Sequence, residues 1–587
     1  MTVGRAIVSF PGLLCLSLCS STALGADWPQ WGGQEGKNMV SQEKALPETF
    51  TPGEKDPQSG GVLLATTKNV KWVARLGSMT CSTPAVAAGR AFIGTARDGQ
   101  GVLLCLDEAT GKPLWQWAAP ARQVPTTVEG RRFEFSHFPR QLGLCSSPAV
   151  DGDRVYIVTH RLEVLCLNVK GRPKASSEPA PAPKPREPSP DKAGAPAEPA
   201  PEGKPSAPAP GTKPAEPASK GTLSRPAAEK APPWPEAPGD ADVVWMFDIW
   251  ELGVRPSDAC DCSPVVDDDF VYVCTANGVD RQAEAGKHDE FRKVPAPTAP
   301  NVIVLDKKTG RLVAMDEERF PERMFHGQWS SLSLGKVGGK KLIFFGGGNG
   351  VCYAFEAPTA AALPGGAPGG AGGKPVTLKT VWSVDCVPKE YRVFGDMPMI
   401  THYCLGDRRR SDSINKSTDG SFVGMSEIIA TPVFHNNRVY VAIGRDPEHG
   451  RGRGALWCID ATKTGDITST GKVWCYQGLD RTLSTVSIAD GLLYVADVAG
   501  RLHCLDADTG NCYWIHETNS KTWGSTLVAD GKVYLPTQKN LWVLAAGREK
   551  KVLDKINVGS AVWASPVAAN GVLYVASQNY LWAIQRQ

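Results

Sequence analysis

Short runs of alternating apolar residues recur along the whole chain, each preceded by a small polar residue and followed by a turn. The phrase SPAVDGDRVYIVT begins at Ser147, and close variants begin at Ser263, Thr431, Ser525 and Ser565. Alternating Val, Tyr and Ile favour β-strands, and the Asp-Gly or Asn-Gly pairs between the runs favour tight hairpins. The pattern therefore predicts an all-β protein built from repeated antiparallel hairpins.

The copies align on one position that is proline in most of them: Pro84, Pro148, Pro264, Leu332, Pro432, Val486, Thr526 and Pro566. The later copies repeat at intervals of about 40 residues, a period typical of propeller blades. Eight copies predict an eight-bladed β-propeller of four-stranded antiparallel blades. A tryptophan ends the predicted fourth strand in several copies, where a large flat side chain can fill the space between neighbouring blades; these are Trp115, Trp245, Trp382, Trp474 and Trp514.

The ends of the chain indicate how the ring closes. The last copy reaches Gln587 after only three strands, while the segment 69–76, NVKWVARL, precedes the first copy as an isolated strand. We expect that strand to complete the last blade and so remove an open sheet edge. The propeller then spans residues 69–587 as one domain, after an N-terminal leader over residues 26–68.

Three insertions interrupt the repeats. Residues 171–240 are rich in Pro, Ala, Lys and Glu and predict a disordered loop within the second blade, and residues 357–376 form a Gly/Pro-rich loop. The long loop 388–427 has a mixed composition with aromatic, His and Arg residues. Long loops of this kind can carry function, although a variable surface loop is an equally good explanation.

The first 25 residues combine Arg5, an apolar run and small residues near Gly25, which predicts a signal peptide. We therefore expect a soluble protein exported to the periplasm, cell envelope or extracellular space, without a transmembrane segment. Both cysteines of this segment follow leucine, so no lipid anchor is expected. The formal net charge of +3 argues against nucleic-acid binding, and a monomer is expected.

The cysteines fall into two groups. Five occupy the same strand position in their repeats and are expected to be buried core thiols: Cys105, Cys166, Cys352, Cys458 and Cys504. Four others lie near the start of the inner strands and could form disulfides, although spacing alone does not determine the pairing: Cys81, Cys145, Cys260 and Cys262.

The blade endings EATGKPLW and DADTGNCYW, the openings of the form S-P-V-V-x-x-G-x-V-Y-V and the closure of the last blade resemble the PQQ-like (quinoprotein-type, BamB-like) β-propeller repeat proteins. The leader DWPQWGG is similar to the start of exported proteins of this kind. The resemblance implies either a quinone-dependent dehydrogenase, with PQQ beside a calcium ion on the central axis, or a BamB-like assembly scaffold.

The chain has no Cys-Cys pair and no C-x-x-C-H haem motif, and the calcium ligands of the dehydrogenases find no counterpart in it. The resemblance therefore favours a binding or protein-assembly scaffold with no catalytic residues, metal or cofactor. The alternative is a PQQ- or metal-dependent oxidoreductase, of the alcohol or sugar dehydrogenase type, with its site at the mouth of the channel.

One ring of positions is a candidate binding site. Three residues before each aligned position lie Cys81, Cys145, Asp261, Trp329, Ile429, Leu483, Trp523 and Trp563. If the S-x-P strand is innermost in each blade, these residues surround one mouth of the channel. A stacking pocket for a planar or carbohydrate-like ligand would be formed by Asp261, Trp329, Trp523 and Trp563, together with His326 and with His402 of the long loop. The competing interpretation is that the tryptophans fill the channel as part of the hydrophobic core. Besides such a small ligand, an envelope protein is the other expected partner.

Overall fold

The computed structural model describes residues 25–122, 142–172, 238–256, 260–279, 294–319, 327–363, 374–391, 427–444 and 453–586, with short strands at 127–128, 131–132, 292–293, 323–324, 393–394 and 397–398. The predicted signal peptide lies outside the described residues except for Gly25. So do residues 173–237, 364–373 and 399–426, which make up most of the three predicted insertions.

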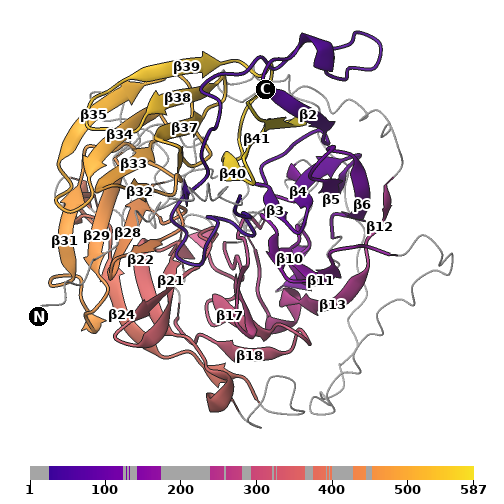
Figure 1. Ribbon diagram of the computed structural model, residues 1–587. Helices are drawn as coiled ribbons and strands as arrows, with labels where there is room; N and C mark the ends of the chain where they lie inside the picture. Colours follow the sequence, from indigo (N-terminus) through magenta and orange to yellow (C-terminus); the bar gives the residue numbers. More distant parts are fainter. Residues whose placement is uncertain are drawn as a thin grey trace, which may run out of the picture.

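Eight small sheets stand around a central axis, which confirms the predicted eight-bladed propeller (Figure 1). From the inner to the outer edge, the strands of blades 1 to 4 are β3 (Ala85–Ala87), β4 (Arg90–Arg97), β5 (Gln100–Asp107) and β6 (Pro113–Pro120); β9 (Ala149–Asp151), β10 (Arg154–Val158), β11 (Glu163–Asn168) and β13 (Val243–Asp248); β14 (Val265–Asp267), β15 (Phe270–Cys274), β17 (Val302–Asp306) and β18 (Leu312–Met315); β20 (Ser333–Val337), β21 (Lys340–Gly346), β22 (Val351–Glu356) and β24 (Thr380–Asp385).

Blades 5 to 8 follow the same order. Their strands are β27 (Val433–His435), β28 (Arg438–Ile443), β29 (Ala455–Asp460) and β31 (Lys472–Tyr476); β32 (Ser487–Ala489), β33 (Leu492–Ala496), β34 (Arg501–Asp506) and β35 (Cys512–Glu517); β36 (Leu527–Ala529), β37 (Lys532–Pro536), β38 (Leu541–Ala545) and β39 (Val552–Ile556); β40 (Val567–Ala569), β41 (Val572–Ala576), β42 (Tyr580–Ile584) and β2 (Val70–Arg75). The S-x-P segment leads into the innermost strand of each blade, as expected.

The ring closes as the sequence predicts. Strand β2 pairs antiparallel with β42, with Trp72 opposite Ala583 and Arg75 opposite Tyr580. Residues from the two ends of the chain therefore form one blade, and no blade of the described ring is left with three strands.

Four blades carry a fifth, two-residue strand that the repeat pattern did not predict. The strands β12 (Gly239–Asp240), β23 (Val376–Thr377) and β30 (Gly465–Asp466) pair in parallel with the outer strands of blades 1, 3 and 4, and β1 (Val40–Ser41) pairs with the inner strand of blade 7. The three outer additions come from the chain of the following blade. They therefore tie neighbouring blades together at the rim.

Where the fourth strand carries a tryptophan, that side chain joins the blade to the next, as predicted. The indole of Trp115 donates to the carbonyl of Val169 at 2.8 Å, and the indole of Trp382 donates to that of Ala461 at 3.2 Å. A glycine lies against the ring face of several of them; at Gly111 a Cβ atom would stand only 2.5 Å from Trp72, and its φ of +70° also favours glycine. This contact explains why the turn carries glycine where it meets the tryptophan of the preceding blade.

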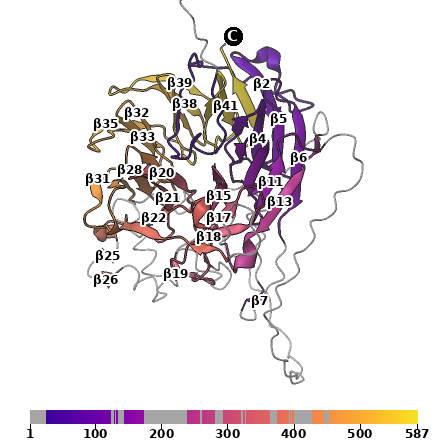
Figure 2. The ribbon, with the colours of Figure 1, turned by 60° about the horizontal axis from the view of Figure 1, so that its bottom comes forward.

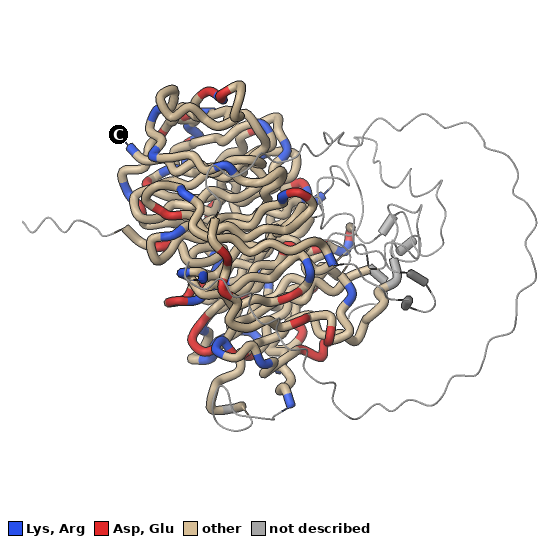
Figure 3. Tube along the Cα trace, turned by 90° about the vertical axis from the view of Figure 1, so that its right-hand side faces the viewer, with Lys and Arg blue, Asp and Glu red and all other residues tan. Residues whose placement is uncertain are grey.

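Helices are limited to short 3-10 turns at η1 (Leu64–Thr66), η2 (Ile249–Leu252), η3 (Ala360–Ala362) and η4 (Lys389–Tyr391) in the described chain. None of these has the length or apolar character needed to cross a bilayer. Lysine, arginine, aspartate and glutamate are interspersed over the described surface (Figure 3).

The propeller has two distinct faces. Inner strands of all blades begin at one face, which we call the mouth face, and end at the other, which we call the leader face. The small hairpins β7–β8 (Thr127–Val128, Arg131–Arg132), β16–β19 (Arg292–Lys293, Arg323–Met324) and β25–β26 (Val393–Phe394, Met397–Pro398) are separate from the blades. In Figure 2 the labelled strands β7, β19, β25 and β26 all lie on the same side of the ring. They belong to segments that enter inner strands from the mouth face.

Candidate functional site: the two ends of the central channel

A ring of hydroxyl hydrogen bonds surrounds the axis between the two faces. The residue before each aligned position is Ser or Thr in all eight copies, and the backbone N–H of one copy donates to the hydroxyl of the next. The bonds run from Thr83 to Ser147 (3.0 Å), Ser147 to Ser263 (3.0 Å), Ser263 to Ser331 (2.9 Å), Thr431 to Thr485 (3.1 Å), Thr485 to Ser525 (2.9 Å), Ser525 to Ser565 (2.8 Å) and Ser565 to Thr83 (3.1 Å). Between blades 4 and 5, the Ser330 hydroxyl donates to the Ala430 carbonyl at 3.0 Å.

This ring shows that the repeated phrase is mainly architectural. An inner strand at the edge of its sheet has backbone donors that its own blade does not satisfy. The neighbouring hydroxyl supplies the missing acceptor and fixes the spacing between blades. The signal was present in the sequence, as Ser or Thr at one position of all eight copies, but our sequence interpretation did not use it.

The leader crosses the axis at the other end of the same strands. Residues 28–41 pass the blades in order and bond each one at the second residue after its aligned position (Figure 1, indigo). The bonds are Trp28 with Val86, in both directions at 2.8 Å; Val150 N–H to Pro29 O, 2.7 Å; Val266 N–H to Gln30 Oε1, 3.3 Å; Leu334 N–H to Glu35 O and Phe434 N–H to Gly36 O, each 2.9 Å; Ile488 N–H to Asn38 Oδ1, 2.8 Å; Val528 N–H to Met39 O, 3.0 Å; and Ser41 Oγ to Ala568 O, 2.9 Å.

The leader is buried as well as bonded. Trp28 and Met39 are 3 % and 0 % exposed, and the chain turns tightly at Gly33, where φ is +71° and a Cβ atom would stand 2.9 Å from the Trp28 ring. The DWPQWGG segment thus acts as a cap that covers the leader face of the axis. Its eight-fold bonding was not predictable from the repeats, because the leader has no periodicity of its own and contributes mostly backbone groups.

Lys37 is the most unusual side chain of this cap. It is fully buried, and its ammonium group donates to Trp31 O at 2.8 Å and to Gln30 Oε1 at 3.2 Å. Burial lowers the pKa of Lys37 to about 7, although the nearby charge of Glu35 opposes the shift. The same burial raises the pKa of Glu35.

The predicted ring of candidate residues lies at the mouth face. Positions before and after each ring residue are buried, whereas Asp261, Trp329, Trp523 and Trp563 are half-buried or exposed. In an extended segment, alternate side chains point to opposite sides, so the ring residues lie on a different side from their buried neighbours. About five residues of extended chain, or roughly 16 Å, separate this ring from the leader bonds.

The structure places the predicted site residues in two sets of neighbouring blades, and only one set shows a direct contact. Asp261 and Trp329 occupy equivalent positions in blades 3 and 4, where Ser263 and Ser331 are joined by a hydrogen bond. Trp523 and Trp563 contact each other directly, with ring centroids 5.5 Å apart at 76°. His326 and His402 lie outside the described residues, so their part in the site stays a prediction, and ligand binding by the ring is likewise untested.

Asp261 is the acidic group of the mouth. Its side chain is accessible to solvent, yet protein surrounds it on most sides, as expected for a group within a narrow opening. This desolvation raises the pKa of Asp261 to about 6, against an opposing hydrogen-bond interaction with the Cys145 thiol.

The ring residues do not by themselves supply a calcium site. Calcium takes six to eight oxygen ligands, but among the ring residues only Asp261 offers a hard oxygen; the others are Cys, Trp, Ile and Leu. No group of three or more His, Cys, Asp or Glu side chains in the described chain is arranged to hold a metal ion.

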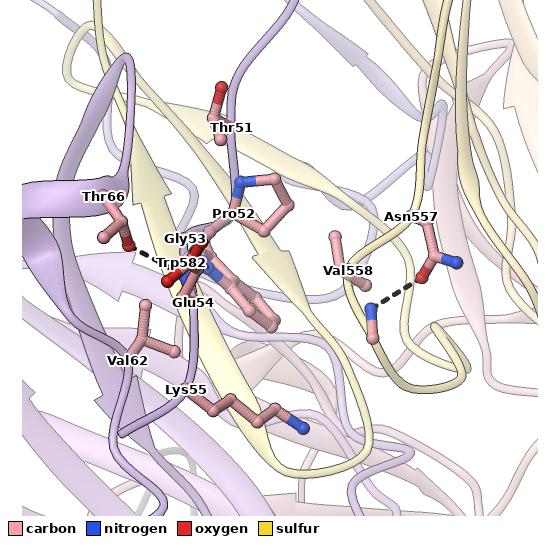
Figure 4. Close-up of a pocket in the computed structure, with 11 residues that line it drawn as sticks. Thr51, Pro52, Gly53, Glu54, Lys55, Val62, Thr66, Asn557, Val558 and Trp582 are labelled. Atoms are coloured by element: carbon pink, nitrogen blue, oxygen red, sulfur yellow. Dashed lines mark hydrogen bonds between the residues drawn. The ribbon is translucent and has the colours of Figure 1, made fainter. Parts of the chain in front are cut away.

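A separate cavity lies at the rim, away from the predicted site. It measures about 290 Å³ and is lined by leader residues 51–55, Val62 and Thr66 on one side and by Asn557, Val558, Gly559 and Trp582 on the other (Figure 4). The Trp582 indole donates to Pro52 O at 3.2 Å, which fixes the leader against blade 8. Sequence reasoning did not find this cavity, since its lining comes from segments more than 480 residues apart.

Comparison with known proteins agrees with the architecture. The family described as outer membrane protein assembly factor BamB matches residues 59–184 and 455–563, and no curated protein matches the chain. The match covers less than half of the chain and, together with the eight blades and their repeats, supports a PQQ-like β-propeller.

Solved structures similar to this chain include a BamB protein and two dehydrogenases. BamB from Moraxella catarrhalis is 11 % identical, with a TM-score of 0.47, over 87 % of this chain and 98 % of that one. A europium-containing methanol dehydrogenase is also 11 % identical, with a TM-score of 0.46, over 94 % and 89 %. The quinohemoprotein alcohol dehydrogenase from Comamonas testosteroni is 13 % identical, with a TM-score of 0.42, over 96 % and 81 %. Likeness at this level carries no argument about activity.

Proposed function

We propose that the protein is an exported binding scaffold that receives a partner or ligand at the mouth face of its propeller. The observation that carries the proposal is that the two ends of the channel are built differently. The leader bonds all eight blades at one end, whereas the other end presents partly exposed tryptophans.

Aromatic side chains at an opening are suited to binding. Trp523 and Trp563 offer large rigid surfaces with little conformational entropy to lose, which is why tryptophan is enriched in binding hot spots. The additional hairpins on the same face widen the surface available to a protein partner. Export is proposed from the apolar N-terminal segment alone.

A quinone-dependent oxidoreductase is the weaker alternative, because the described ring residues offer one carboxylate where a calcium–quinone pair needs several oxygen ligands. A direct test is available. The purified protein is incubated with PQQ and calcium, and quinone absorbance and dye reduction with alcohols or sugars are followed. Saturable uptake with turnover would overturn the scaffold proposal.

Binding is tested with the full chain and matched variants. We expect the wild type to retain a stoichiometric envelope protein, or to show saturable fluorescence changes with a soluble oligosaccharide. The double variant Trp523→Ala/Trp563→Ala should lose that binding while remaining folded. Tyr513→Ala, an exposed aromatic on the outer strand β35, is the control and should bind as the wild type does. Equal binding by all three proteins would contradict a site at the mouth.

A further inference from the structure

Two cysteines of the mouth ring lie in neighbouring blades. Cys81 and Cys145 occupy the same position in blades 1 and 2, and the chain just after them is held in register. The Ser82 hydroxyl donates to Ser146 O at 3.0 Å, and Thr83 N–H donates to the Ser147 hydroxyl at 3.0 Å. Cys81 and Asp261 both lie close enough to the Cys145 thiol to raise its pKa.

These thiols differ from most other cysteines of the described chain, among which Cys475 and Cys512 are also not buried. The five repeat cysteines are fully buried within strands, and Cys260, Cys262 and Cys274 are at most 1 % exposed. Burial raises the pKa of such thiols, to about 12 at Cys166, which makes them unreactive. Cys81 is half-buried at the mouth, where a reagent in the channel can reach it, and Cys145 behind it is 8 % exposed.

We propose that Cys81 and Cys145 form a redox-active dithiol that closes to a disulfide between blades 1 and 2 at the mouth face, with Asp261 as a positioning and proton-accepting residue. The oxidant is a disulfide, either a small molecule or a protein. This proposal does not depend on the binding function of the mouth.

The chemistry proceeds in two exchange steps. The Cys81 thiolate attacks an R–S–S–R′ disulfide, forming Cys81–S–S–R and releasing R′–S⁻, which takes up the proton that Cys81 lost. Cys145 then attacks the Cys81 sulfur, its proton passes to the Asp261 carboxylate, and R–S⁻ leaves and takes up that proton from Asp261. The protein loses two hydrogens, and the oxidant is reduced to two thiols.

Asp261 suits the second step for a physical reason. Burial and the neighbouring Cys81 hold the pKa of Cys145 well above its usual value, so this thiol needs a base beside it. The Asp261 carboxylate, with a pKa of about 6, is ionised above that pH but is a stronger base than an ordinary aspartate.

The test uses the full chain, reduced and then equilibrated with oxidised glutathione. Trypsin separates the two cysteines into peptides 76–90 and 141–154, each with one cysteine. We expect a cross-linked pair of these peptides that dithiothreitol dissociates. Cys81→Ser and Cys145→Ser should each abolish it, whereas Cys512→Ser, which removes an exposed cysteine on β35, should not. If both cysteines remain fully alkylatable in the folded wild type after equilibration, the proposal is wrong.

A pH profile separates the role of Asp261 from mere packing. In the wild type, the rate of the second step should rise as the pH passes about 6. Asp261→Asn should slow this step on the order of tenfold or more, remove the inflection, and leave the Cys81–glutathione mixed disulfide to accumulate. An unchanged inflection in Asp261→Asn would remove Asp261 from the mechanism.

Discussion

The two ends of the central channel are built from the same eight inner strands but are finished differently. At the leader face, residues 28–41 satisfy one backbone group of every blade in turn and bury Trp28, Lys37 and Met39. At the mouth face, the equivalent ring residues differ from blade to blade, with thiols, a carboxylate, aliphatic groups and three tryptophans. The leader face is uniform in its bonding, whereas the mouth face is varied in its chemistry.

This difference separates what stability requires from what the fold leaves free. Backbone donors at a sheet edge must be satisfied in every blade, so the leader bonds all eight blades and the hydroxyl ring links seven of the eight neighbouring pairs in the same way. The mouth residues have no such shared requirement, and their variety is what a site with specific contacts needs. The following predictions test whether the two ends differ in this way.

Removing the leader should have the largest effect. Each hydrogen bond contributes about 0.5–1.5 kcal/mol, and burial of Trp28 and Met39 adds about 1.5–3 kcal/mol each. Deletion of residues 26–41 should therefore cost on the order of 10 kcal/mol, comparable with the whole stability of a typical domain. Replacing residues 173–237 by a short Gly/Ser linker is the control and should change the urea unfolding midpoint little. A leaderless protein with an unchanged midpoint would mean that the cap is dispensable.

Tryptophans between blades should matter more for stability than tryptophans at the mouth. Trp382 is 0 % exposed and bonded to blade 5, so Trp382→Ala should cost about 3–5 kcal/mol. Trp523→Ala should cost about 1 kcal/mol, because the side chain is only half-buried and the cavity can fill with water. Equilibrium denaturation of both variants gives the comparison. If Trp523→Ala lowered the free energy of unfolding as much as Trp382→Ala, the mouth tryptophans would belong to the hydrophobic core.

The two ends should respond to pH in opposite directions. The pKa of Lys37 is lowered to about 7 from 10.5, so the unfolded state binds more protons between these values and stability should rise from pH 7 toward 10, by roughly 4 kcal/mol at most. The pKa of Asp261 is raised to about 6 from 3.8, so the folded state binds more protons there and stability should fall from pH 4 to 6, on the order of 1 kcal/mol after allowance for solvent screening.

Variants assign each limb of the pH profile. Lys37→Met should flatten the rise above pH 7, and Asp261→Asn should flatten the fall below pH 6, in unfolding free energies measured by urea titration across the pH range. A rise that persists in Lys37→Met would show that another group at the leader face is responsible.

The smallest effect should come from one link of the hydroxyl ring. Ser525→Ala removes the acceptor for the Thr485 backbone N–H and should cost about 1–2 kcal/mol, because a buried donor is left without a partner. Ser59→Ala, which removes an exposed acceptor of Gly61, should cost less than about 0.5 kcal/mol. Denaturant midpoints of the two variants measure the difference. Equal midpoints would mean that the ring contributes no stability.

The sequence predicted the parts of the fold that repeat. The aligned copies gave the number of blades, the isolated strand around Trp72 gave the closure, and the fourth-strand tryptophans gave the contacts between blades, since each of these follows from a pattern present many times. The buried repeat cysteines, such as Cys105, were predicted for the same reason.

The parts that occur once were missed. The cap formed by residues 28–41 bonds mainly through its backbone, which leaves no sequence signature, and strands of two residues such as β12 are too short to show alternation. The position of Asp261, Trp329, Trp523 and Trp563 in one ring was predicted from their place in the repeat, but their pairing across neighbouring blades depends on spacings that only the folded ring defines. His326 and His402 still await a test.

The closure of the last blade has a consequence for biosynthesis. Strand β2 is made early but finds its partner β42 only when translation has nearly finished, and the contacts it makes span over 500 residues. Long-range pairing of this kind is slow, and the incomplete ring exposes edges prone to aggregation until it forms. Because the cap needs a docking point on blade 8 as well as on blade 1, it can seat fully only on a finished circle, and its seating serves as a checkpoint for complete assembly.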